Sequence, residues 1–410
     1  MTSPATNSVV LRKSVKPNVL HIIDSFDQGG TERQAIQLVR LLHESNHYRV
    51  HLACIHDRGV LRSEVERLGI GDITAYPLNS FYNRNFAVQL RRLKRLLRER
   101  EIEILHTHGL YTNVFGIIGA TLAGVPVRIA SRRETGFLRN GLRRWGERRA
   151  FSLSHAIVAN AEAVRRQLIT EGVPSQKVIT VYNGLNVERF APPQAVLTRE
   201  EALARLGLPC EPSRRLVTIV ANTRHPVKDH PMFLRAAHQV RDSVPEAAFV
   251  IAGEGGLVAS LQALAEELGI GRDVYFIGRC ERVPELLAVS EVCVLSSKAE
   301  GFSNAILEYM AAGRAVVATD VGGAREAVVE GDTGLLVPAG DDAAMAKRII
   351  SLLGNPERAR EMGERGRRIV QEKFSCEAQL ARTVNLYDEL MARAAPRWLR
   401  SDETIVREGA

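Results

Sequence analysis

The chain has 410 residues, long enough for two domains, and its 45% hydrophobic and 25% charged residues are ordinary for a globular protein. Its longest apolar run, residues 114–127, is too short to cross a bilayer, and the N-terminus lacks the apolar stretch of a signal peptide. The five cysteines show no paired spacing, which favours a reducing compartment and speaks against a thiolate metal site. We therefore expect a cytoplasmic protein.

The first half of the chain alternates short apolar runs with segments of helical periodicity. Residues 1–16 are polar and irregular, and we expect them to form a disordered leader. Strands are expected at residues 19–26, 48–55, 103–108, 127–132, 156–160 and 178–183. This alternation predicts a parallel sheet with helices on both faces, in a first domain that spans residues 17–190.

The same alternation returns after residues 191–215, which are rich in proline and charge and which we interpret as a linker. Further strands are expected at residues 216–222, 248–253, 274–278, 292–297, 315–320 and 334–338. A second domain therefore spans residues 216–373, and residues 374–410 are expected to form a helix that crosses back, followed by a tail. The predicted fold class is α/β, with two tandem Rossmann-like doubly wound domains and a ligand cleft between them.

Positive charge is concentrated in the first half of the chain. Residues 1–190 contain 28 Lys and Arg against 16 Asp and Glu, and much of the excess lies at residues 91–100. Such clusters suit anionic lipid headgroups or a phosphorylated substrate, or they form a merely solvated basic face. Residues 91–100 also fit an amphipathic helix with Leu93, Leu96 and Leu97 turned inward. No nucleic-acid-binding motif accompanies the charge and aromatic residues are only 5%, so we expect no nucleic acid partner.

The sequence EGFSNAILE places Glu300 and Glu308 on either side of an expected helix start. Ser303 is a preferred N-cap residue and Gly313 suits the helix end, so Glu308 lies about one turn inside the helix. N–H groups of the first helical turn have no partner within the helix and attract phosphate. Two carboxylates that flank such an anion site suit a ligand composed of a sugar, a diphosphate and a ribose. The spacing alone is more often explained by one glutamate in a loop and one solvated glutamate on a helix, with no ligand role for either.

The second domain has cationic and glycine-rich segments where strands are expected to end. Arg224 and Lys228 follow its first strand, where their charges suit a diphosphate, although isolated cations there are more often plain surface residues. The next strand runs into AGEGG, residues 252–256, a turn that lets a base or ribose approach the backbone. The chain has neither a GxGxxG fingerprint after this first strand nor a Walker lysine loop, so no nicotinamide cofactor is indicated.

Two motifs follow strands of the first domain. Gly29 and Gly30 permit a tight turn with exposed N–H groups, and Thr31 suits the N-cap of the next helix. His106 and His108 share one face of the third expected strand, at its end, which is a favoured catalytic position. They equally fit core positions bonded to the backbone. A metal site is a third alternative, but no acidic or thiol ligand accompanies them at a credible spacing, and we expect no metal.

Taken in order, the motifs resemble those of a known family. The chain contains GGTE, HTHG, NAEAV, YNGL, ANTRHPVKDH, IAGEGG, FIGR, the segment at residues 300–328 and GDTGLLVP. This order is similar to that of the family-4 (GT4) retaining glycosyltransferases, which have the two-Rossmann GT-B fold. The resemblance extends over residues 18–390, and residues 300–338 are its most specific part.

The resemblance implies a role for each matching residue. Glu300 would hold the hydroxyls of the donor sugar, and Glu308 would hold the ribose of the nucleotide. Arg224 and Lys228 would neutralise the departing diphosphate in place of a metal, and His108 would contact the donor sugar near the reacting carbon. Further donor-binding positions are implied at Gly29, Gly30, Gly253 and Arg279, and at the backbone of Gly301, Phe302, Ser303 and Asn304.

The implied activity is transfer of a sugar, with retention, from a nucleotide-diphosphate donor to a hydroxyl of a glycan or lipid-linked acceptor. Its implied place is the biosynthesis of a cell-surface polysaccharide or glycolipid. The nucleotide sugar is then a co-substrate, and no cofactor is expected. The basic first domain suits peripheral contact with anionic lipids on the inner face of the plasma membrane. The alternatives are another GT-B enzyme, such as an epimerase or phosphorylase, or a non-catalytic nucleotide-sugar-binding protein.

Overall fold

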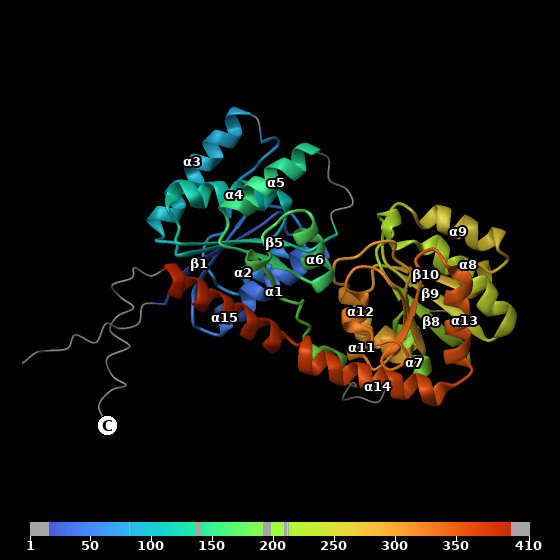
Figure 1. Cartoon of the computed structure of the whole chain (residues 1–410). Helices are drawn as coiled ribbons and strands as arrows, with labels where there is room; N and C mark the ends of the chain where they lie inside the picture. The colour runs from blue at the N-terminus through green and yellow to red at the C-terminus, as the bar shows by residue number, and fades with distance from the viewer. Residues whose placement is uncertain are drawn as a thin grey trace, which may run out of the picture. The chain divides into compact units, whose positions relative to one another are not determined.

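The computed structural model describes residues 16–81, 83–135, 141–191, 198–208, 211 and 213–394. The expected leader except its last residue, part of the expected linker and the end of the chain lie outside these residues. Strands and helices alternate along the described chain (Figure 1). Every strand expected from the sequence is present, and the short strand β3 (Thr74–Ala75) is additional.

Seven strands form the first sheet, in the order β3-β2-β1-β4-β5-β6-β7. Besides β3 they are β1 (Asn18–Ile23), β2 (Arg49–Cys54), β4 (Ile104–Thr107), β5 (Val127–Arg132), β6 (Ala156–Ala159) and β7 (Val178–Thr180). Strand β1 pairs in parallel with both β2 and β4, so the strand order reverses between β1 and β4. Ligands of open α/β sheets bind beyond the carboxyl ends of the strands at such a reversal.

Six strands form the second sheet, in the order β10-β9-β8-β11-β12-β13. They are β8 (Arg215–Val220), β9 (Ala247–Ala252), β10 (Val274–Gly278), β11 (Val292–Leu295), β12 (Ala315–Thr319) and β13 (Gly334–Val337). Here the order reverses between β8 and β11, which pair in parallel. The segment that carries Lys228 follows β8, and the segment that carries Glu300 follows β11, so both begin at this reversal.

Helices cover both faces of each sheet, as the alternating sequence pattern predicts (Figure 1). Around the first sheet they are α1 (Gly30–Glu44), α2 (Arg62–Glu66), α3 (Arg84–Glu99), α4 (Leu110–Ala123), α5 (Gly141–Leu153) and α6 (Glu162–Thr170). The later helices are α7 (Arg199–Arg205), α8 (His230–Ser243), α9 (Val258–Glu267), α10 (Val283–Val289), α11 (Asn304–Ala311), α12 (Ala324–Ala327), α13 (Asp342–Leu353), α14 (Pro356–Lys373) and α15 (Cys376–Ala394). Short 3₁₀ turns are η1 (Ser175–Lys177), η2 (Val187–Phe190), η3 (Pro226–Lys228) and η4 (Gly271–Asp273).

Strand β9 shows how the second sheet is buried on both faces. Phe249 and Ile251 belong to a core cluster that includes residues of α8 and α13. The intervening Ala248 and Val250 belong to another cluster, with residues of α7 and α10. Because successive side chains of a strand point to opposite faces, an unbroken apolar run such as AAFVIA indicates helices on both sides.

By its internal contacts the chain forms two compact units. The first comprises Met1–Ala130, Arg149–His155 and Tyr387–Ala410, and the second comprises Ser131–Arg148 and Ala156–Leu386. The last helix, α15, therefore begins in the second unit and ends in the first. Among the residues that the structure describes, no helix combines the length and the apolar character needed to span a bilayer.

Candidate functional site

Helix α11 confirms that Glu300 and Glu308 flank a helix start. The helix begins at Asn304 with Ser303 at the N-cap position, and Glu308 lies within it. The Ser303 side chain makes no capping hydrogen bond, so the N-cap position is confirmed but the capping bond is not. Gly313, with φ of 67°, follows the helix end in the left-handed conformation that the sequence predicts for it.

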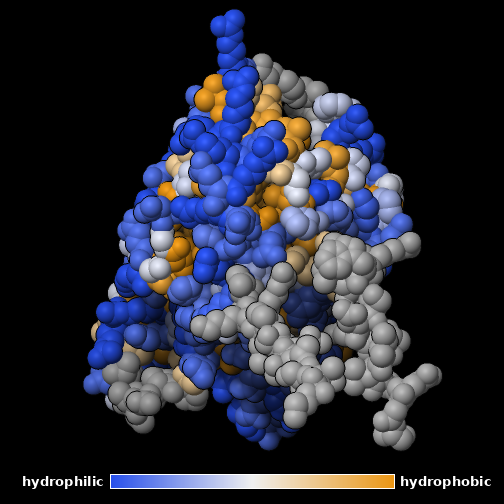
Figure 2. Space-filling view, turned by 90° about the vertical axis from the view of Figure 1, so that its left-hand side faces the viewer, coloured by the Kyte–Doolittle hydropathy of each residue, from blue (hydrophilic) through white to orange (hydrophobic). Residues whose placement is uncertain are grey.

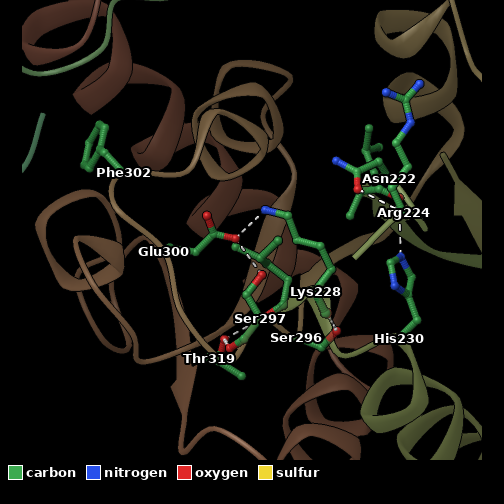
Figure 3. Close-up of polar contacts among 12 residues, drawn as sticks. Asn222, Arg224, Lys228, His230, Ser296, Ser297, Glu300, Phe302 and Thr319 are labelled. Carbon is green, nitrogen blue, oxygen red and sulfur yellow. Dashed lines mark hydrogen bonds and ion pairs between the residues drawn. The ribbon is translucent and has the colours of Figure 1, made fainter. Parts of the chain in front are cut away.

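The structure brings Lys228 and Glu300 together in one ion pair, in which Lys228 Nζ lies 2.5 Å from Glu300 Oε1 (Figure 3). The two side chains are only 21% and 13% exposed, respectively. Lys228 is the last residue of the η3 turn after β8, and Glu300 lies in the segment that connects β11 to α11. A cation and a carboxylate thus meet at the carboxyl edge of the second sheet, four residues before α11 begins.

Two hydroxyl residues that the sequence reading overlooked hold this pair in place. Ser297 Oγ donates a hydrogen bond to Glu300 Oε1 over 2.6 Å, and Ser296 Oγ donates to the carbonyl oxygen of Lys228 over 2.8 Å. Thr319, at the end of β12, donates to the carbonyl oxygen of Ser297 over 2.6 Å (Figure 3). A run of small hydroxyl residues at a strand end, as in VLSS, is the sequence signal that was available for these contacts.

Arg224 lies on the same strand-end segment as Lys228 but has a different partner. Its guanidinium forms an ion pair with Glu254, and the two side chains are about half exposed. Glu254 belongs to the glycine-rich turn after β9. The pair therefore joins the segment predicted to bind a diphosphate to the turn predicted to receive a base or ribose. At this exposure an ion pair contributes little to stability, so Arg224 is available to exchange its carboxylate for another anion.

The glycine-rich turn after β9 requires glycine at two positions. A Cβ atom on Gly253 would lie 2.0 Å from the carbonyl oxygen of Ala221, and one on Gly255 would meet the backbone of Thr223 at 2.2 Å. The N–H of Gly253 also donates to the carbonyl oxygen of Gly278, next to Arg279, over 2.8 Å. The predicted positions Gly253 and Arg279 thus belong to adjacent strand ends.

A second glycine pair supports the backbone before α11. Gly322 has φ of 55°, and a Cβ atom there would lie 2.1 Å from the carbonyl oxygen of Glu300. The next residue, Gly323, donates its N–H to the carbonyl oxygen of Gly301 over 2.8 Å. Both glycines lie within residues 300–338, the most specific part of the family resemblance. Phe302 has a buried side chain that packs against Phe374, so only its backbone is open to a ligand role.

Tyr309 joins α11 to the second sheet. Its hydroxyl accepts a hydrogen bond from the N–H of Val220 over 2.7 Å and donates one to the carbonyl oxygen of Val294 over 3.2 Å. Burial raises the pKa of this phenol well above its ordinary value, so the hydroxyl stays protonated and able to donate. Helix α11 is therefore held, through its second half, against β8 and β11, the strands after which Lys228 and Glu300 lie.

In the first unit, α1 begins at Gly30, with Gly29 at the N-cap position. Thr31 lies inside the first turn, so the prediction that Thr31 caps this helix is wrong. Glycine at the N-cap supplies no side-chain acceptor, and the Glu32 carboxylate lies beside Gly29 at this helix start. The two glycines thus lie at a helix start that follows β1.

His106 and His108 lie on one face, as predicted, with ring centroids 4.4 Å apart. Both are buried, and they share this face with His21 of β1, which the sequence reading missed. One ring nitrogen from each of the three lies within 4.8 Å of the others, a spacing that raises the question of a metal. However, His21 Nδ1 and His108 Nε2 are 2.8 Å apart in rings inclined by only 11°.

That geometry is a hydrogen bond and not a pair of metal ligands. Nearly parallel rings with these two nitrogens 2.8 Å apart fit an N–H···N hydrogen bond, in which one ring donates and the other accepts. Two nitrogen ligands of a tetrahedral zinc ion would lie about 3.3 Å apart, with their lone pairs converging on the ion. The described side chains therefore fit a hydrogen-bonded cluster better than a metal centre.

Two family models match the chain. The model of the Glycosyltransferase Family 4 matches residues 28–189, and that of the Glycosyl transferases group 1 matches residues 210–369. Between them they cover most of both sheets.

Individual proteins give the same result. The chain is 30% identical over 329 residues to the putative glycosyltransferase EpsD of Bacillus subtilis, which covers 76% of this chain and 82% of EpsD. It is 29% identical over 322 residues to a D-inositol 3-phosphate glycosyltransferase of Streptomyces coelicolor, covering 71% of this chain and 69% of that protein. The crystal structure of Anabaena Alr3699/HepE in complex with UDP superposes with a TM-score of 0.79, at 18% identity, over 91% of this chain and all of that one. This structural likeness confirms the fold.

Proposed function

Because the chain belongs to the family-4 glycosyltransferases, we propose that it transfers a sugar from a nucleotide-diphosphate donor to a hydroxyl group, with retention and without a metal. The observation that carries this proposal is the Lys228–Glu300 pair, which lies at the carboxyl edge of the second sheet just before α11. A cation, a carboxylate and a helix N-terminus gathered at one edge suit a diphosphate attached to a polyhydroxylated group.

Donor binding would exchange partners within this group. In the structure Glu300 neutralises Lys228, so neither charge is buried alone. A bound diphosphate offers Lys228 a stronger anion, and Glu300 then becomes free to accept hydrogen bonds from the sugar hydroxyls. Arg224 makes the same exchange more readily, because its pair with Glu254 is about half exposed. The N–H groups at Gly301 to Asn304 add hydrogen bonds to the phosphate oxygens.

The remaining residues complete the donor site in this proposal. Glu308, inside α11, holds the ribose hydroxyls, and the turn at Gly253 with Arg279 receives the base or ribose against the backbone. The turn at Gly29 and Gly30 brings the phosphates to the start of α1, where the Gly29 N–H already donates to the carbonyl oxygen of Asp27 and the following N–H groups are the ones offered. His108 contacts the donor sugar near the reacting carbon.

The reaction that fits these residues is a front-face substitution. The bond between the anomeric carbon and the diphosphate oxygen breaks, and the acceptor oxygen bonds to the same face of that carbon. The acceptor proton passes to an oxygen of the departing diphosphate. Negative charge develops on the diphosphate, so Lys228, Arg224 and the helix N–H groups stabilise the transition state most. Glu300 acts as a hydroxyl ligand and needs no covalent intermediate, unlike the nucleophile of a retaining glycosidase.

The donor proposal is tested by binding and then by turnover. Thermal unfolding is measured with UDP-, GDP-, ADP- and dTDP-sugars, because a ligand that binds only the native state raises the unfolding temperature. The donor that binds is then offered with a panel of hydroxyl acceptors, and product is followed by mass spectrometry. We expect one class of nucleotide sugar to bind and to be consumed. Binding without consumption across the panel would instead support a non-catalytic nucleotide-sugar-binding protein.

Two further measurements test stereochemistry and metal independence. The anomeric proton coupling of the product, measured by NMR, is expected to match that of the donor, which is retention. Activity is expected to survive extensive dialysis against EDTA, because Lys228 and Arg224 carry the compensating charge. An inverted product, or activity restored only by a divalent cation, would contradict these two parts of the proposal.

We place the acceptor among anionic or lipid-linked glycans of cell-surface polysaccharide or glycolipid biosynthesis. The excess of basic residues before residue 190 favours an anionic acceptor. A relative of similar length is named for D-inositol 3-phosphate, an acceptor that carries a phosphate. We therefore expect phosphorylated or lipid-diphosphate-linked acceptors to be used at lower concentrations than their neutral counterparts.

The basic helix α3 supports peripheral contact with an anionic membrane at the cytoplasmic face. The helix is amphipathic as predicted, with Leu93 and Leu97 buried, Leu96 partly buried, and Arg91 and Arg95 exposed. Figure 2 shows that hydrophilic side chains predominate on this side of the molecule, with separate hydrophobic patches between them. The exposed arginines of α3 attract anionic headgroups within a Debye length.

Co-sedimentation with liposomes tests this contact. We expect binding to vesicles that contain phosphatidylglycerol at low salt and release at high salt, and no binding to phosphatidylcholine alone. Changing Arg91, Arg95 and Arg98 to Gln should weaken the binding. An unchanged pellet for this variant, or no pellet at any salt concentration, would overturn the membrane contact and leave the donor site untouched.

A further inference from the structure

We infer that His21 and Tyr387 are positioning residues that set which nitrogen of His108 carries the proton. The inference rests on the proposed role of His108 at the donor sugar. All three side chains belong to the first unit, and each is at most 1% exposed. They come from β1, from the end of β4 and from α15, so three segments far apart in the sequence meet in one cluster.

A chain of hydrogen bonds connects these side chains. His108 Nε2 lies 2.8 Å from His21 Nδ1, and His21 Nε2 lies 3.4 Å from the Tyr387 hydroxyl. The same hydroxyl lies 2.7 Å from His106 Nδ1. Each neutral imidazole has one N–H donor and one acceptor nitrogen, and the phenol has one O–H donor. The donors along the chain must therefore all point the same way.

The distances select one of the two directions. An O–H donor makes shorter hydrogen bonds than an N–H donor, and the Tyr387–His106 contact of 2.7 Å is the shortest in the chain. Tyr387 therefore donates to His106 and accepts, over 3.4 Å, from the N–H at His21 Nε2. His21 Nδ1 is then the acceptor, and it receives the proton of His108 Nε2.

This direction determines what His108 offers a ligand. With Nε2 bound as a donor to His21, the Nδ1 atom of neutral His108 is the acceptor nitrogen. An acceptor at that position takes a hydrogen bond from a sugar hydroxyl. In the opposite tautomer Nδ1 carries the proton, so it cannot accept a hydrogen bond from a sugar hydroxyl. The catalytic contact is made by His108, and His21 and Tyr387 act through it.

Tyr387 is itself held by contacts outside the chain. Its ring packs edge-on against Tyr48, with centroids 5.5 Å apart, and the Tyr48 hydroxyl donates to Asp388 over 3.0 Å. Burial raises the pKa of Tyr387 well above its ordinary value, so the phenol remains a donor. The Tyr48 hydroxyl thus offers a matched control, because its removal disturbs the same pair of rings without breaking the histidine chain.

The test combines a spectroscopic and a kinetic measurement on the full-length protein. Two-dimensional ¹⁵N NMR with labelled histidine reports which ring nitrogen of His108 is protonated, with the signal assigned by comparison with His108→Asn. We expect a single Nε2–H form in the wild type and a mixture of forms in Tyr387→Phe. In Tyr387→Phe, His108 is no longer held in a single tautomer, and this should lower kcat/KM for the donor about fivefold. Tyr48→Phe should keep both the wild-type spectrum and, within about twofold, the kinetics.

A second pair of variants separates positioning from packing. His21→Gln keeps an acceptor oxygen for His108 and should retain most of the activity. His21→Leu removes the acceptor and should lose most of the activity. Thermal unfolding of each variant shows whether it is folded. If His21→Leu does not fold, the Tyr387→Phe data decide between positioning and packing.

Three results would overturn the inference: an Nδ1–H form of wild-type His108, an unchanged His108 spectrum in Tyr387→Phe, or one equivalent of metal in protein purified without an affinity tag. Absence of any glycosyl transfer by the wild type would count against the proposed function alone, because the NMR measurement needs no turnover.

Discussion

Lys228 Nζ and Glu300 Oε1 lie 2.5 Å apart, although 72 residues separate them in the sequence. Both residues were predicted to bind different parts of one donor molecule, and in the structure they bind each other. The pair is largely buried, so removal of one partner leaves the other charge without compensation. The proposed donor would therefore have to break this ion pair when it binds at this edge of the sheet.

Lys228→Ala should remove a cation that stabilises the departing diphosphate. We expect kcat to fall by about 10²- to 10³-fold, as on loss of a preorganised donor at a developing anion. Lys298→Ala serves as the matched control, because Lys298 lies on the same segment as Glu300 but is 61% exposed and pairs with Asp229. Steady-state kinetics with the donor identified by thermal shift measure both. Wild-type turnover by Lys228→Ala would show that Lys228 does not stabilise the departing diphosphate.

Glu308→Ala should weaken nucleotide binding more than it changes chemistry. A carboxylate that accepts hydrogen bonds from ribose hydroxyls contributes to the free energy of binding. Its loss should therefore raise the Kd of the nucleoside diphosphate about 10- to 100-fold. Glu308→Gln keeps one acceptor oxygen and should lose less. Isothermal titration calorimetry with the free nucleoside diphosphate gives the comparison. Equal affinity for the wild type and both variants would show that Glu308 does not contact the nucleotide.

Gly253→Ala should destabilise the fold at the turn after β9. The new Cβ atom would lie 2.0 Å from the carbonyl oxygen of Ala221, which is backbone and cannot swing aside. We expect the free energy of unfolding in urea to fall by about 1–3 kcal/mol. In Gly256→Ala the new atom meets nothing within 4 Å, and the change should stay within about 0.5 kcal/mol. Similar losses in the two variants would contradict the close approach of the turn to Ala221.

His51 should make the protein less stable in mild acid. Burial, with Arg100 and Arg49 nearby, lowers the pKa of His51 from 6.5 to about 4. Arg100 donates to His51 Nδ1 over 3.0 Å, so the folded protein holds this histidine neutral. Between these two values the unfolded chain binds a proton that the folded chain does not, so the free energy of unfolding falls as pH falls. Above pH 6.5 the contribution of His51 is fully present.

Urea unfolding across that pH range measures the effect. His51→Gln should reduce the slope of unfolding free energy against pH, and a residual slope should remain because burial also lowers the pKa of His230. The exposed His47 provides a control, and His47→Gln should leave the slope unchanged. A slope that is the same in His51→Gln and in the wild type would show that His51 titrates alike in both states.

Much of the architecture could be predicted because it follows from local patterns. Strands such as β9 are unbroken apolar runs, and α3 shows helical periodicity with leucines on one face. Gly313 indicated where α11 ends, because few other residues adopt its left-handed conformation. The error at Thr31 arose because this helix starts two residues earlier, with glycine at the N-cap. Such small shifts of a helix start have small energy differences.

Side-chain partners could not be predicted, because they depend on which strand ends become neighbours. Nothing local shows that Arg224 selects Glu254 while Lys228 selects Glu300. The histidine cluster is the clearest case: the HTH motif was visible, but His21 and Tyr387 were not singled out.

By itself, the sequence determined the order of strands and helices, the two-sheet class and the strand ends where the candidate residues lie, because each depends on apolar periodicity over a few residues. Only the tertiary structure decided that Lys228 is neutralised by Glu300 and that Tyr387, 281 residues from His106, completes the histidine chain. Hydrogen bonds and ion pairs act over about 3 Å, so they form only after packing has brought distant segments together.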